Sequence, residues 1–332
     1  MGILDKRDEM ENKMLYTQTY PWAYKHFKDG RSNNWTPEEV SMLTDREQWQ
    51  NDSLTPEEKN LVMYNLKLFA SAEALTQDNI AMALFPYIQD GYARMYMMRQ
   101  AFEEALHTDT FLYIVDSLGF NLKEIYEGYY DVPSIKEKDD FLISFTQGVS
   151  LDSIDISTIE GKQALFKNMF GFFFLLEGIS FYGNFAQILS LGRANKMPGL
   201  TKQIEYILRD EGIHVDFGFD LMNTIKQEYP EIWTEDFKSE LNAAVRTAVD
   251  LERIYNKGSM QKGLLGLNAE VFDQYIQYIA DRRLDMLGLG AFYGSENPFP
   301  WLGAAQDLLK ETNFFENKPT EYQTKALKMD DF

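Results

Sequence analysis

Residues 168–192 form a long apolar run in which Glu177 is the only charged residue. A run of this length could cross a membrane, but Asn184, Gln187 and Ser190 dilute it and no other segment of the chain resembles a span. We therefore predict a core helix enclosed by other helices. An ionised Glu177 in that setting costs several kcal/mol unless a partner compensates its charge. The residue is either a structural acid, protonated or paired with an arginine, or a functional one.

The rest of the chain also shows helical periodicity. Thr55, followed by Pro56 and two glutamates, is typical of a helix start. No alternating strand pattern, internal repeat or linker competes, so we predict one all-α domain over residues 36–310. Irregular segments are expected before it, at 1–35, and after it, at 311–332. The predicted helices cover about residues 56–85, 92–117, 134–148, 158–191, 201–227, 235–256 and 269–288.

Composition excludes several classes of function. The formal net charge of −20 argues against nucleic-acid binding, because phosphate contacts need clustered Lys and Arg. The absence of cysteine excludes disulfides, thiolate nucleophiles and cysteine-ligated metal clusters. With only three histidines, a metal would be held mainly by carboxylates, which favours iron or manganese over zinc or copper. The first residues lack the apolar core of a signal peptide, so we expect a cytoplasmic protein.

Two copies of a Glu-x-x-His motif lie in predicted helices, and two further acids stand alone in apolar helical runs. Because residues three apart share one face of a helix, each motif can present both side chains to one metal. Glu103 could replace Glu104 as the ligand of the first motif, since it lies four residues before His107, but the repeated spacing favours Glu104. The candidate ligands, in chain order, are Glu73, Glu104, His107, Glu177, Glu211 and His214.

The charges of these six side chains fit a pair of metal ions. Four carboxylates and two neutral imidazoles carry four negative charges, which two divalent cations neutralise. One glutamate from each of two helices and Glu-x-x-His from each of two others is the ligand set of ferritin-like dimetal-carboxylate bundles. We therefore predict an all-α, ferritin-like helical bundle with two metal ions per chain in its core.

With these residues in view, the chain resembles the small, radical-generating (β) subunit of class I ribonucleotide reductases. The resemblance covers nearly the whole chain, includes all six candidate ligands, and extends to NNWTPEEV, RQAFEEALHTDTFLYI, LLEGISFY, YILRDEGIH, ADRRL, NPFPW and NFFENKPTEYQ. It implies a homodimer whose dimetal cofactor generates a radical in a large (α) subunit, where ribonucleotides, expected to be ribonucleoside diphosphates, are reduced to deoxyribonucleotides. The absence of cysteine agrees with this division of labour, because ribonucleotide reduction needs thiols and the large subunit would supply them.

One position departs from the usual pattern of this family. Most members carry a radical-bearing tyrosine four residues after the first ligand histidine, and here that position is Phe111, whose ring has no O–H. The chain thus resembles tyrosine-less members (class Ic and related groups), in which a high-valent Mn/Fe or Mn/Mn cluster stores the oxidising equivalent. Mn/Fe is the expected pair, with Mn/Mn and Fe/Fe as alternatives. Tyr113 is predicted to point to another face of the helix, and plain core packing is the alternative role for Phe111.

The resemblance also implies a path for radical transfer. Trp35 matches the tryptophan at which the path starts, and Asp210 matches the aspartate that links this indole to the ligand His107. Tyr322 matches the tyrosine that passes the radical to the large subunit, from a C-terminal tail expected to be flexible and to dock there. Tyr206 matches a tyrosine that helps to deliver an electron during cofactor assembly in tyrosine-less members.

Two alternatives use the same fold. One is a ligand-binding oxidase with a Mn/Fe site, and the presence of Tyr322, of the Trp35–Asp210 pair and of an acidic terminus speaks against it. The other is a ferritin-like metal store or a helical interaction module. Ferritin-like metal-storage proteins assemble from chains about half this length and do not need a path for radical transfer.

Overall fold

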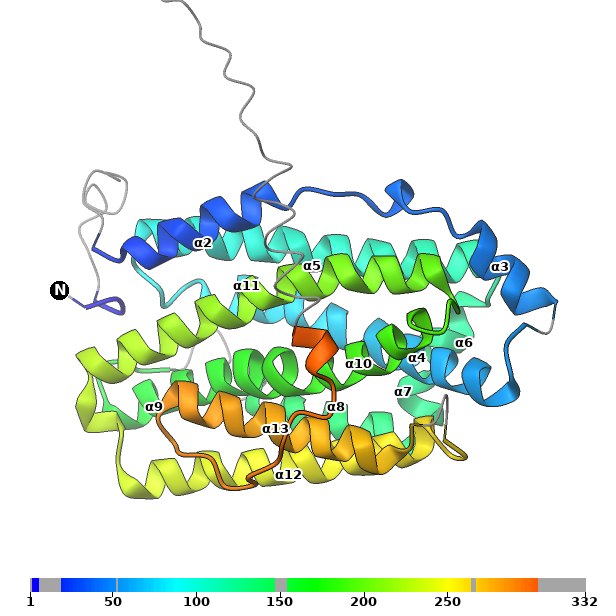
Figure 1. Cartoon of the computed structure of the whole chain (residues 1–332). Helices are drawn as coiled ribbons and strands as arrows, with labels where there is room; N and C mark the ends of the chain where they lie inside the picture. Colours follow the sequence, from blue (N-terminus) through cyan, green and yellow to red (C-terminus); the bar gives the residue numbers. More distant parts are fainter. Residues whose placement is uncertain (1, 6–18, 52, 147–153, 264–266, 304–332) are drawn as a thin grey trace, which may run out of the picture.

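The chain is described here by a computed structural model that covers residues 2–5, 19–51, 53–146, 154–263 and 267–303. Within these ranges the side chains of residues 71, 73–78, 81, 82 and 146 are not described. The described residues form helices joined by loops, without a β-strand, so the prediction of an all-α fold is confirmed (Figure 1).

Long helices form the body of the bundle, and shorter ones close its ends (Figure 1). The helix pairs α4 with α5, α10 with α11, and α12 with α13 pack along one another, while α8 and α13 both lie against the central π-helix η3. The long helices are α4 (Pro56–Asp78), α5 (Gly91–Leu118), α8 (Pro133–Thr146), α9 (Ile159–Met169), η3 (Phe170–Ser180), α10 (Phe181–Gly192), α11 (Pro198–Glu228), α12 (Glu235–Ser259) and α13 (Ala269–Leu287). Helix α2 (Pro21–Ser32) packs against α5, and the shorter elements are η1 (Pro37–Glu39), α3 (Leu43–Gln50), η2 (Asn79–Leu84), α6 (Leu122–Tyr126), α7 (Gly128–Asp131) and η4 (Pro230–Ile232).

The expectation that residues 1–35 are irregular is wrong for α2. Pro21 occupies the first turn of this helix, where a missing backbone N–H has no cost, and the helix packs against both α5 and α11. Its buried stripe consists of Ala23, His26 and Gly30. These residues are small or polar, so the stripe does not resemble the large aliphatic pattern by which a core-facing helix is recognised. The expected C-terminal tail, residues 311–332, lies outside the described part of the chain.

The apolar run is a core helix, as predicted. Its three parts, α9, η3 and α10, follow one another without a break, and 89% of the window that could span a membrane is buried inside the protein. The π-helical middle, η3, contains Glu177, and every residue in it is buried. The wider turn of a π-helix changes which backbone groups pair, and the carbonyl of Gly178 accepts a hydrogen bond from Nε of Arg283 in α13, at 3.2 Å. Segments of π-helix often mark functional sites.

Helix α11 begins at Pro198, a little earlier than predicted, and a side chain from another helix caps it. The carboxylate of Asp45, in α3, accepts the backbone N–H of Gly199 at 2.7 Å and that of Leu200 at 2.8 Å. These two N–H groups have no partner within α11, because the first turn of a helix has no preceding carbonyls. A Cβ on Gly199 would lie 2.8 Å from Asp45 Oδ2 and 2.7 Å from the carbonyl of Ser41, so only glycine permits this close approach.

We expect Asp45→Ala to lower the free energy of unfolding of the metal-free protein by about 1–2 kcal/mol, because it leaves two buried N–H groups without an acceptor. The midpoint of urea unfolding measures this loss. Glu47→Ala, an exposed acid on the same helix, serves as the matched control and should change the midpoint little. Equal midpoints for the two variants would contradict the capping role.

Candidate metal centre

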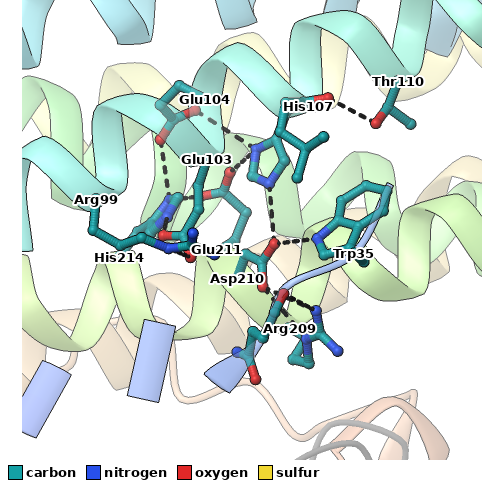
Figure 2. Close-up of polar contacts among 12 residues, drawn as sticks. Trp35, Arg99, Glu103, Glu104, His107, Thr110, Arg209, Asp210, Glu211 and His214 are labelled. Atoms are coloured by element: carbon teal, nitrogen blue, oxygen red, sulfur yellow. Dashed lines mark hydrogen bonds and ion pairs between the residues drawn. The ribbon is translucent and has the colours of Figure 1, made fainter. Parts of the chain in front are cut away.

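Four helices bring the predicted ligands to the centre of the bundle. Helix α5 contributes Glu104 and His107, and α11 contributes Glu211 and His214, each pair one turn apart on the face toward the other helix (Figure 2). Glu177 comes from η3. Glu73 lies in α4, but its side chain is outside the described part of the structure.

The described ligands converge closely. One possible ligand atom from each of Glu104, Glu177, Glu211 and His214 lies within 4.8 Å of the corresponding atom in the other three residues, and all four side chains are fully buried. Nδ1 of His214 is 3.0 Å from Glu104 Oε1 and 3.3 Å from Glu211 Oε2.

His107 is the remaining candidate ligand whose side chain is described, and it approaches the carboxylates from the side opposite His214. Its Nδ1 is 3.2 Å from Glu211 Oε1 and 3.7 Å from Glu104 Oε2. The two imidazole rings lie with their centroids 5.8 Å apart. Both histidines thus direct Nδ1 toward the same two carboxylates, so Glu104 and Glu211 lie between them and could help to hold a pair of cations.

Burial and mutual repulsion make this cluster unfavourable without added positive charge. Burial, followed by the negative charges of Glu211 and Glu104, raises the pKa of Glu177 well above its usual range. Burial alone would lower the pKa of His214, but the surrounding tyrosine and carboxylates outweigh it and raise this pKa well above its usual value. Burial would likewise raise the pKa of Glu104, but the charges and hydrogen bonds of His214 and His107 lower it.

Several ligand atoms lack a hydrogen-bond partner, which is the geometric reason to expect cations here. In the described part of the chain, Glu177 Oε2 and both carboxylate oxygens of Glu211 are buried without a hydrogen bond. Leaving such groups unsatisfied costs about 1–3 kcal/mol each. Carboxylate oxygens and imidazole nitrogens are donors that suit iron and manganese. The residues present therefore fit a metal pair.

The residues matched to the radical path lie beside this cluster. The indole N–H of Trp35 donates to Asp210 Oδ2 at 2.7 Å, and the same oxygen is 3.6 Å from His107 Nε2 (Figure 2). Tyr206 packs on the other side of Trp35, with ring centroids 5.1 Å apart. Tyr322 lies outside the described residues.

The aromatic positions after His107 occupy different surroundings. Phe111 is 2% exposed and stacks on Phe69, with centroids 4.8 Å apart and ring planes 15° apart. The hydroxyl of Tyr113 donates to the carbonyl of Val40 at 3.0 Å, next to η1. Tyr113 therefore points to a different face of α5 from Phe111.

Sequence reasoning missed the contacts of several polar side chains with the candidate ligands and with Asp210. Gln100 donates to Glu177 Oε1 at 3.0 Å. Glu103, considered above as an alternative ligand, contacts His214 Nε2 on the side away from the cluster. Arg209 donates to Asp210 Oδ1 at 3.3 Å. The available signal was helical spacing, because Gln100 lies one turn before Glu104; the identity of each partner depends on how the helices pack.

A bundle of helices that encloses carboxylates and imidazoles in its core defines the class of ferritin-like dimetal-carboxylate proteins. Comparison with known sequences narrows this class. The chain belongs to the family of ribonucleotide reductase small chains, since the family model "Ribonucleotide reductase, small chain" matches residues 12–298.

Individual relatives agree with this membership. "Ribonucleoside-diphosphate reductase subunit beta" of Chlamydia pneumoniae is 45% identical over 317 residues, which cover 96% of this chain and 92% of that protein. The solved structure of the ribonucleotide reductase R2 subunit from Clostridium botulinum has a TM-score of 0.79 at 24% identity and covers 87% of this chain and 89% of that one. Dimanganese(II)-NrdF from Streptococcus sanguinis has a TM-score of 0.74 at 18% identity, covering 88% and 98%. Both structures share the fold.

The chain is therefore the small subunit of a ribonucleotide reductase and part of an oxidoreductase. This result confirms the family predicted from the sequence. It does not favour the ligand-binding oxidase that the sequence left as the alternative.

We expect metal binding to release protons and to weaken as the pH falls. The raised pKa values of Glu177 and His214 keep both groups protonated to a higher pH than usual when no metal is bound, and both protons must leave before the groups can act as ligands. Titration with Mn(II) by calorimetry, in buffers of different ionisation enthalpy, measures the released protons. Affinity should drop between about pH 8 and about pH 6. An affinity that does not change over this range would contradict the prediction.

Proposed function

We propose that this chain is the radical-generating small subunit of a ribonucleoside-diphosphate reductase of the tyrosine-less type. The observation that carries the proposal is Phe111, a buried phenyl ring at the position where most family members have the radical tyrosine. Because this ring has no O–H, the stored oxidising equivalent is assigned to the metal pair itself. Mn/Fe is the proposed pair, with Mn/Mn and Fe/Fe as alternatives.

The proposed partner is a large (α) subunit that binds the diphosphate substrate. The name of the Chlamydia pneumoniae relative supports a diphosphate, and the absence of cysteine requires that the thiols for the reduction come from another chain. We further propose a cytoplasmic homodimer without nucleic-acid or membrane contacts. Met98 and Phe102, one turn apart on α5 and each 56% exposed, offer an apolar surface for the second copy.

Six residues are proposed to hold the metals: Glu73, Glu104, His107, Glu177, Glu211 and His214. When bound, such a pair would supply one-electron oxidising power. Manganese is a metal that this fold accepts, as the name of the Streptococcus sanguinis protein indicates. Burial of all the described ligands excludes bulk water and keeps their charges strong.

The protein's own residues are proposed to couple this site to its surface. Asp210 accepts the indole N–H of Trp35 and faces Nε2 of His107, so one carboxylate connects an oxidisable ring to a ligand. Arg209 and His107 lower the pKa of Asp210 against the effect of burial, which keeps it an acceptor. When Trp35 loses an electron, its Nε1 proton can remain shared with Asp210. Tyr206, beside Trp35, is proposed to deliver an electron during cofactor assembly, and Tyr322 to pass the radical to the large subunit.

We expect the active protein to show no tyrosyl radical at position 111 and to be most active when manganese is supplied together with iron. Electron paramagnetic resonance and turnover with the large subunit, on protein assembled with iron alone, manganese alone or both, test this expectation. Activity that follows a tyrosyl signal in protein loaded with iron alone would contradict the tyrosine-less assignment.

We expect Tyr322→Phe to abolish turnover with the large subunit while metal loading and partner affinity stay unchanged, because the substitution removes only the O–H of a ring proposed to carry the radical. Tyr113→Phe is the matched control: its O–H contacts a backbone carbonyl away from the site, so turnover should persist. Turnover of Tyr322→Phe near that of the unmodified protein would end the idea of a relay at this residue.

A further inference from the structure

Behind each described ligand histidine lies a buried carboxylate, and an arginine contacts each carboxylate (Figure 2). On one side Asp210 faces Nε2 of His107 and accepts from Arg209. On the other, Glu103 Oε2 lies 2.9 Å from Nε2 of His214, and Glu103 Oε1 accepts from Nε of Arg99 at 2.8 Å. The pattern of histidine, carboxylate and arginine is thus repeated, once from each of the two ligand helices.

The two carboxylates differ in what else they contact. Asp210 also accepts the indole N–H of Trp35, an oxidisable group. Glu103 instead packs against the backbone of α2: a Cβ built on Gly30 would lie 3.2 Å from Glu103 Oε1 and 3.3 Å from Arg99 Cγ. Glycine at position 30 therefore lets α2 approach close enough to cover this carboxylate. Glu103 is fully buried, so the chain has enclosed a charge that Arg99 compensates.

A carboxylate behind a ligand histidine has two physical effects. It accepts the N–H of the distant ring nitrogen, which fixes the tautomer so that the near nitrogen carries the lone pair, and it makes that nitrogen a stronger donor. At His214 this arrangement leaves Nδ1 facing Glu104 and Glu211, the side on which the metals are expected.

We propose that Glu103 is a positioning residue of the metal centre: it orients His214 and strengthens the metal position that His214 serves, without linking this position to an oxidisable side chain. The contrast with Asp210 makes the two metal positions unequal, one joined to Trp35 and the other held by Glu103, Arg99 and the close approach of Gly30. This inference rests on the proposed metal centre.

The test measures Mn(II) binding alone, without the partner subunit. Metal-free unmodified protein, Glu103→Gln and Gly30→Ala are each titrated with Mn(II), and bound and free ion are followed by electron paramagnetic resonance. We expect Glu103→Gln to weaken one of two binding steps by about 10- to 100-fold, the range typical for the loss of a carboxylate behind a metal ligand, and to leave the other step within about twofold. Gly30→Ala keeps every polar group but displaces the carboxylate, so it should weaken the same step by a smaller factor.

Glu252→Gln provides the matched control. Glu252 is a buried acid paired with a buried lysine, Lys138, at 2.8 Å in another part of the bundle, so its loss should not change Mn(II) affinity. Thermal unfolding of each metal-free variant shows whether folding is affected. If Glu103→Gln is poorly folded, Gly30→Ala decides the question.

The outcomes separate the inference from the function on which it rests. Unmodified protein that binds no Mn(II) would overturn the proposed metal centre. Unmodified protein that binds two ions, with variants at Glu103 and Gly30 that bind both equally well, would overturn the role of Glu103 alone. An equal loss of affinity in Glu252→Gln would also overturn it, because the effect would then follow from removing any buried charge.

Discussion

The burial of ionisable side chains away from water is the constraint on which the rest of this structure depends. Glu104, Glu177, Glu211 and His214 converge in the core with no exposed surface. Such a cluster is unstable unless cations or protons balance it. Each helix that carries one of these residues therefore has two tasks: to present its side chain inward and to supply the apolar surface that keeps water out. The long apolar run with one acid, α9 to α10, is the clearest result of combining both tasks in one segment.

The carboxylates that face the distant ring nitrogens of His107 and His214 have different neighbours, and this distinguishes the two sides of the site. Asp210 connects His107 with an indole, whereas Glu103 connects His214 with a guanidinium and with the backbone of another helix. In the proposed function, the site holds metal ions and exchanges electrons with a distant protein, and such a difference would serve both. We infer that electron exchange would be favoured on the side where the indole of Trp35 is hydrogen-bonded, and ion retention on the side where the Glu103–Arg99 pair contacts His214.

Much of the fold and most of the candidate ligand set could be predicted from the sequence, for specific physical reasons. Apolar spacing and helix-start residues predicted α5 and α11 to within a few residues and one continuous helix over α4 and η2. The repeated Glu-x-x-His spacing predicted that Glu104, His107, Glu211 and His214 meet in one place. Local spacing did not predict the π-helix η3, in which the carbonyl of Gly178 accepts a hydrogen bond from Nε of Arg283, far along the chain. The contact of Glu103 with His214 could not be predicted from the sequence either, because it forms only when α5 packs against α11.

Helix α2 has a consequence for where this protein can be shortened. The sequence predicted an irregular segment here, yet Trp22 packs on Phe217 and His26 contacts Asp220 at 2.8 Å, so α2 is held against α11 close to the proposed ligand His214. Its backbone at Gly30 covers the buried charge pair on α5. Removing α2 would uncover the Glu103–Arg99 pair, although every proposed ligand would remain. A shortened chain that keeps this cover over the proposed metal centre should therefore begin before Pro21.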